Sequence, residues 1–229
     1  MPETRGVLLP AYVMADESGS MSSCYAELSD GLTSLFESLR AEPMIAAKLR
    51  LSVLGFSGDV QERLPLSDVR DGAQPPGLVI RGATSYAAAF RDLLSRIPAD
   101  INRLKQDGYK VHRPVVFFLS DGQPTDRKAN EWQDPHGRLV DRSVTPAGPN
   151  IVAFGVGRAE PGTILSVATR QEFAGVAGPG ADIGRAISEF FQMLTASLVA
   201  SGQALASNNP EIVVQRPDPD HFRLAIDVV

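Results

Sequence analysis

The chain has 229 residues, 43% of them hydrophobic and 21% charged, which is the composition of a soluble globular protein long enough to bury one large core. Its 27 acidic side chains outnumber its 22 lysines and arginines, and the net charge is −5. Because this balance gives no general attraction to phosphates, we expect no nucleic-acid partner.

Four short apolar runs are predicted to form strands, at 7–15, 49–56, 114–120 and 150–157. Continuous apolar runs are typical of strands that are buried on both faces of a sheet, so helices must cover both faces. Three amphipathic segments are predicted to be those helices, at 24–43, 85–97 and 183–201. The alternation of strands and helices predicts a three-layer, doubly wound, Rossmann-like α/β fold with a mostly parallel central sheet.

Two segments between and after these elements have a different character. The run at 60–69 alternates weakly and contains Pro65, which predicts one antiparallel edge strand paired with 49–56. Beyond 201 the sequence becomes rich in proline and asparagine, so we expect a domain at 1–201 and a tail at 202–229. Within that tail, 211–215 and 222–229 have strand-like composition and are expected to add short edge strands.

The sequence also predicts where the protein resides. Cys24 is the only cysteine and cannot form an internal disulfide, and acids near the N-terminus interrupt any secretory signal. No run approaches the roughly 20 apolar residues of a membrane-spanning helix. We therefore expect a cytoplasmic protein without a membrane partner.

The single cysteine and the three histidines are not expected to have a functional role. Cys24, early in a helix, is expected to be buried and inert. His112, His136 and His221 are scattered and are expected at the surface. Trp132 lies in a charged, exposed segment, which leaves open a contact with a partner or packing against a helix.

Polar side chains follow the predicted strands, at the sheet edge where ligands bind in such folds. They are Asp16, Ser18 and Ser20 after the first strand, Asp121 after the run at 114–120, and Thr84 before a helix. Carboxylates and hydroxyls are hard oxygen ligands, which suit Mg²⁺, Mn²⁺ or Ca²⁺ better than zinc or copper. Because five such side chains cannot complete an octahedral shell, one position on the ion would stay open to an outside group.

Each of these motifs has a simpler explanation when it is taken alone. Ser18 or Thr84 could cap a helix, and Asp121-Gly122 could be a turn after a strand. Their common placement at one edge of the predicted sheet favours a cation site instead.

The sequence Asp16-Glu17-Ser18-Gly19-Ser20, together with Thr84 and Ser120-Asp121-Gly122, resembles the metal-ion-dependent adhesion site (MIDAS) of von Willebrand factor A (VWA) domains. The likeness extends from 7 to about 200. Among such domains the chain is most similar to bacterial stand-alone proteins of tellurium resistance and stress response. That resemblance implies a magnesium-binding protein that works in the cytoplasm beside a protein kinase and a phosphatase.

The resemblance also implies a role for each residue of the site. Ser18, Ser20 and Thr84 would contact the metal directly or through water, while Asp16 and Asp121 would hold bound waters. An Asp or Glu of a partner protein would take the open position. Glu17 replaces the small residue that is frequent in the family, and a carboxylate pointing into the site would strengthen cation binding and repel an acidic partner.

Two functions follow from this pattern. The first is a protein-binding module without enzymatic activity, which recruits an acidic residue through the cation. The alternative is a Mg²⁺-dependent aspartyl-phosphate phosphatase with Asp16 as the nucleophile. Such enzymes usually place a second Asp two residues later as the acid and base, and Ser18 stands there instead.

Overall fold

The central sheet of the computed structural model has eight strands. They are β1 (Val7–Asp16), β2 (Leu49–Phe56), β3 (Val60–Ser67), β4 (Lys110–Val111), β5 (Val115–Ser120), β6 (Asn150–Gly155), β7 (Ala174–Ala177) and β8 (Phe222–Leu224). Their order is β3-β2-β1-β5-β6-β7-β8, and β4 pairs with the start of β1. The structure describes residues 5–128, 130–178, 180–207, 213–214 and 222–224.

The sheet is mostly parallel, as the sequence predicts. β3 runs antiparallel to β2 at one edge, and β8 runs antiparallel to β7 at the other. The pairing of β3 shifts register between Leu64 and Ser67, the stretch that contains Pro65. A proline has no N–H to give to the ladder, so an irregular stretch of an edge strand accommodates it.

Six α-helices and two short 3₁₀ helices are present in the described part of the chain. They are η1 (Gly19–Cys24), α1 (Tyr25–Ala41), α2 (Pro43–Ala46), α3 (Tyr86–Gln106), α4 (Gln133–Val140), α5 (Pro161–Val167), η2 (Gln171–Phe173) and α6 (Ile183–Ala206). α3 continues through Pro98, well beyond its predicted end at 97. α6 passes the expected domain boundary at 201, and β8 lies in the expected tail. Of the tail segment 211–215, only 213–214 are described, and neither forms a strand.

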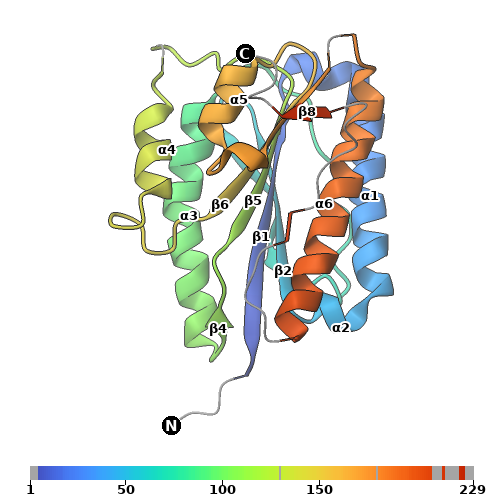
Figure 1. Cartoon of the computed structure of the whole chain (residues 1–229), viewed down its shortest axis with the longest axis vertical. Coiled ribbons are helices and arrows are strands. Elements are labelled where there is room, and N and C mark those ends of the chain that lie inside the picture. Colours follow the sequence, from blue (N-terminus) through green and yellow to red (C-terminus); the bar gives the residue numbers. More distant parts are fainter. Residues whose placement is uncertain (1–4, 129, 179, 208–212, 215–221, 225–229) are drawn as a thin grey trace.

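The helices form a layer on each face of the sheet (Figure 1). Alternate residues of β1 reach the two layers: Val13 joins the core with α1 and α6, while Tyr12 and Met14 join the core with α3, α4 and α5. This is the predicted three-layer α/β sandwich. No helix among the described residues is long and apolar enough to cross a membrane.

Of the three histidines expected at the surface, His112 is half-buried and His221 lies outside the described residues, but His136 is buried, with 9% of its surface exposed, so the expectation was wrong for His136. Trp132 is also buried, with 4% exposed, so of its two alternatives the structure has packing in the core. The His136 ring packs against Phe90 and Trp132, and its Nε2 lies 2.9 Å from the carbonyl oxygen of Val167. Both residues therefore belong to the core between α3 and α4. Cys24 is buried, as expected.

The contact between α1 and α6 depends on Gly31. A Cβ atom at this position would lie 2.1 Å from Cδ2 of the buried Phe191. We expect Gly31→Ala to lower the free energy of unfolding by about 1–2 kcal/mol, because the clash outweighs the better helix propensity of alanine. Urea denaturation measures the change. Gly137→Ala in α4, where a Cβ would meet nothing within 4 Å, is the matched control and should not destabilise the protein.

Candidate metal site

Asp16, the last residue of β1, lies at the base of the candidate site and is 0% exposed. Its Oδ1 accepts a hydrogen bond from the backbone N–H of Ser18 (2.8 Å). Its Oδ2 accepts one from the hydroxyl of Ser120, the last residue of β5 (2.6 Å). Because β1 and β5 are neighbours in the sheet, their carboxyl ends deliver these two side chains to the same place.

Ser18, Ser20 and Asp121 continue this chain of oxygen atoms. The Ser18 and Ser20 hydroxyl oxygens are 3.1 Å apart, and the Ser20 hydroxyl donates to Asp121 Oδ1 over 2.7 Å. Ser20 and Asp121 are far apart in the sequence and come from different strand ends. The structure thus brings four of the five predicted residues into one hydrogen-bonded group.

Thr84, the fifth residue, lies in a loop that is hydrogen-bonded to the loop of Ser18 and Ser20. Its backbone N–H donates to the Thr125 hydroxyl (2.9 Å), and the Thr125 N–H donates to its carbonyl (2.8 Å). The Gly19 N–H donates to the carbonyl of Gly82 (3.1 Å), which fixes the Thr84 loop against the loop of Ser18 and Ser20. Among the described residues, no hydrogen bond joins the Thr84 hydroxyl itself to the other four side chains.

The electrostatics of the site favour a bound cation. Burial raises the pKa of Asp16 from 3.8 to about 6, against the opposing effect of the hydrogen bonds from Ser120 and Ser18. Burial also raises the pKa of Asp121, although its hydrogen bond from Ser20 opposes this. Two buried carboxylates that ionise with difficulty gain most from a positive ion between them, so the residues present fit a divalent cation.

A divalent cation at this site would need the hydroxyl groups as ligands in addition to the carboxylates. Within the described ranges, no three His, Cys, Asp or Glu side chains are grouped to hold a metal ion. A cation here would rely on Ser18, Ser20 and Thr84 beside the two carboxylates. Such an all-oxygen set suits a hard ion.

Glu17 does not point into the candidate site. Its carboxylate is fully buried and accepts hydrogen bonds from Arg63 Nε and Nη2 (both 2.8 Å), Arg81 Nε (2.9 Å) and the N–H of Val79 (2.9 Å). It lies against Gly55 of β2, where a Cβ atom would be 2.2 Å from the Glu17 Cδ. Glu17 is therefore a structural acid, and it neither adds to the cation site nor faces a partner.

The ion pair of Glu17 with Arg81 links the Thr84 loop to the end of β1. Arg81 also donates to the carbonyl of Gly55 (2.9 Å), and its backbone N–H donates to the carbonyl of Glu17 (2.6 Å). Since Arg81 precedes Thr84 by only three positions, this network anchors the Thr84 loop to β2 and to the end of β1. Nothing in the sequence signals the pairing of Glu17 with Arg63 or Arg81. The role of Ser120 could have been suspected from its position before Asp121.

The fold of the chain is shared with solved structures of other proteins. The structure has the VWA fold, and it resembles "von Willebrand factor type A from Catenulispora acidiphila" with a TM-score of 0.55 at 12% identity, over 84% of this chain and 42% of the other. No protein-family model matches the sequence, and neither does any curated protein.

Two further solved structures share the fold. One is proximal thread matrix protein 1 from the mussel byssus with a zinc-occupied MIDAS motif (TM-score 0.59, 16% identity, 86% of this chain and 49% of the other). Another is the pilus adhesin SpaC of Lactobacillus rhamnosus GG in an open conformation (TM-score 0.64, 12% identity, 87% and 30%). The chain thus spans about half or less of the proteins it resembles. At these identities the likeness shows the fold alone.

Proposed function

We propose that the protein is a binding module that recruits an acidic residue of a partner protein through a divalent cation, with Mg²⁺ as the first candidate. One observation carries the proposal: the buried Asp16 and the Ser20–Asp121 contact of 2.7 Å place carboxylates and hydroxyls from two strand ends together. The zinc-occupied MIDAS of the mussel protein, on the same fold, supports a divalent ion at this edge.

Each residue of the site has a role in this proposal. Ser18, Ser20 and Thr84 offer hydroxyl oxygens to the ion, and Asp16 and Asp121 supply the negative charge that offsets it. Ser120 and the Ser18 N–H fix the orientation of the Asp16 carboxylate. When bound, the ion supplies an open coordination position that takes the carboxylate of the partner.

The burial of Asp16 favours binding over phosphoryl transfer. A nucleophilic carboxylate must reach a phosphorus atom, whereas Asp16 is 0% exposed and both of its oxygens accept hydrogen bonds. The residue two positions later is Ser18, which cannot act as the acid and base of a phosphatase. We accordingly propose a non-enzymatic protein. Its place in a cytoplasmic bacterial stress or tellurium-resistance complex, with a kinase or phosphatase as partner, rests on the sequence resemblance.

Cation binding is tested with a matched pair of serine variants. We expect Ser18→Ala to lower the Mg²⁺ or Mn²⁺ affinity at least about tenfold, because it removes one ligand. Ser22→Ala, an exposed serine of the neighbouring η1, should bind the ion as the unchanged protein does. Calorimetric titration measures both affinities. Equal affinity of the two variants would remove Ser18 from the site.

Partner recruitment needs a separate experiment. The tagged protein is used to capture partners from a native lysate in Mg²⁺ or in chelator, with Ser18→Ala as the comparison. The proposal expects a partner that is lost in chelator and in Ser18→Ala but is kept in Ser22→Ala. Phosphatase turnover that requires both Mg²⁺ and Asp16 would establish the enzymatic alternative instead.

A further inference from the structure

A second candidate site lies at the opposite end of the sheet from the metal site. It is a pocket of about 580 Å³ between the second half of α3, the segment that precedes β5, and the loop that follows α4. Pro114 of this pocket directly precedes β5, whereas Ser120 of the metal site ends that strand. The volume is in the range of about 300–1,000 Å³ that is usual for small-molecule sites.

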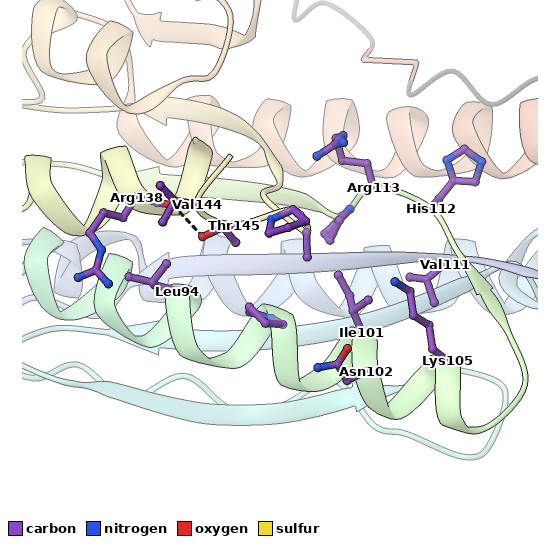
Figure 2. Close-up of a pocket in the computed structure, with 14 residues that line it drawn as sticks. Leu94, Ile101, Asn102, Lys105, Val111, His112, Arg113, Arg138, Val144 and Thr145 are labelled. Atoms are coloured by element: carbon purple, nitrogen blue, oxygen red, sulfur yellow. Dashed lines mark hydrogen bonds between the residues drawn. The ribbon is translucent and has the colours of Figure 1, made fainter. Parts of the chain in front are cut away.

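The body of the pocket is apolar. α3 contributes Leu94, Pro98 and Ile101, and the loop after α4 contributes Val144 and Ala147. Figure 2 labels Leu94, Ile101 and Val144 among them. Val144 is 54% exposed, which makes it one of the few large hydrophobic side chains of the described surface that face solvent. An apolar lining of this kind gains free energy when a hydrocarbon group covers it.

Three basic residues are also among those that line the pocket. Lys105, Arg113 and Arg138 line the pocket, and Figure 2 shows Arg138 at one end of the labelled side chains and Lys105 toward the other. The pocket has no acidic lining residue, and none of the three cations forms an ion pair in the part of the chain that the structure describes. With no acid in its lining, the pocket is positively charged, although the net charge of the protein is −5.

The guanidinium group of Arg113 has no acidic partner among the described residues. Its Nη1 donates to the carbonyl of Gly148 at 2.5 Å. Burial, and then repulsion from Arg142, lower the pKa of its guanidinium. Burial likewise lowers the pKa of His112, which favours the neutral form of its imidazole. An anion bound near Arg113 would relieve this uncompensated charge.

We infer that this pocket binds a small organic anion with an apolar body, namely a carboxylate on a hydrocarbon chain or ring. The apolar walls select against a bare inorganic anion, which gains nothing from Leu94 or Ile101. The cations Lys105, Arg113 and Arg138 select against a neutral hydrocarbon, which leaves their charge uncompensated. The inference is independent of the cation proposed at the other end of the sheet.

Titration of the full chain with octanoate, acetate and 1-octanol tests whether both the charge and the hydrocarbon chain are recognised. Acetate has the carboxylate without the long chain, and 1-octanol has the chain without the charge. Octanoate should bind at one site and more tightly than acetate or 1-octanol. The double variant Lys105→Gln/Arg138→Gln removes an exposed cation from each end of the pocket, so the octanoate carboxylate loses a charge contact whichever end it occupies, and the affinity should fall about three- to fivefold. The matched control Arg127→Gln/Lys128→Gln removes the same charges from exposed residues outside the pocket and should change the affinity less than about twofold.

A second variant acts on the apolar part alone. Ala147 is half-buried in the pocket wall, and Ala147→Trp should fill the space and abolish octanoate binding while the three cations remain. Circular dichroism verifies that each variant is folded. The inference is overturned if octanoate does not bind at millimolar concentration, if 1-octanol or acetate binds as tightly, or if the pocket variants bind like the control. It is also overturned if an acidic peptide binds where octanoate does not.

Discussion

Glu17→Gln is expected to cost about 3–5 kcal/mol of the free energy of unfolding, the usual effect of breaking a buried ion pair on one side only. The Glu17 carboxylate is fully buried and is the counterion of Arg63 and Arg81, whose side chains are only 14% and 17% exposed. An amide in its place leaves two guanidinium groups with too little negative charge. Urea denaturation measures the loss, in chelator so that no bound cation contributes.

Glu62→Gln is the matched control for this variant. Glu62 neighbours Arg63 on β3, and its partner is Arg96 on α3, but the Glu62 side chain is 39% exposed. An exposed pair of this kind contributes at most about 1 kcal/mol. If the two variants lost the same stability, burial of the Glu17 network would not be the cause.

Asp16→Asn is expected to abolish cation binding and at the same time to stabilise the cation-free protein. The asparagine keeps an oxygen that can accept from the Ser18 N–H and an amide that can donate to Ser120, so the fold is preserved. It removes a buried negative charge on which the ion depends. We expect the Mg²⁺ affinity to fall at least about a hundredfold.

The stability gain depends on pH, and its sign follows from the raised pKa of Asp16. The folded protein keeps the proton up to about pH 6, whereas the unfolded chain loses it near 3.8. Between these values the folded state binds more protons, so this side chain lowers stability as the pH rises. The full cost, about 3 kcal/mol as an upper bound, applies above pH 6, and Asp16→Asn removes it.

Urea denaturation in chelator from pH 8 to pH 4 tests this expectation. Asp16→Asn should exceed the unchanged protein in stability at pH 8, and the difference should shrink as the pH falls below 6. Asp30→Asn, at an exposed acid of α1, should show no such trend. Added Mg²⁺ should stabilise the unchanged protein but not Asp16→Asn. If Asp16→Asn were less stable than the unchanged protein at pH 8, the buried charge of Asp16 would not be destabilising and the expectation would be wrong.

The four apolar runs were enough to predict the centre of the sheet, because residues buried on both faces leave a local signal. β1, β2, β5 and β6 lie where they were expected, and β3 is the antiparallel edge strand. The short β4 and β7 have too few residues for any periodicity to appear. The end of α3 was missed because Pro98 usually ends a helix, whereas here the helix passes through it.

The candidate site was predictable wherever its residues follow a strand or precede a helix, since the fold gathers those positions at one edge. Ser18, Ser20 and Asp121 are of this kind, and they lie together. The direction of the Glu17 carboxylate was not predictable, because its partner Arg63 comes from the neighbouring edge strand. The burial of Trp132 depends in the same way on packing against Phe90, which the charged residues around it conceal.

β5 extends from the anion pocket to the metal site, and it is paired along its length with β1 on one side and β6 on the other. To carry a signal between its ends, the strand would have to slide and break both hydrogen-bond ladders at once. The coupling free energy between the two ends should therefore be close to zero. If both proposed sites are occupied, binding at one end should leave the affinity at the other unchanged, so the cation and the organic anion would bind as two independent ligands.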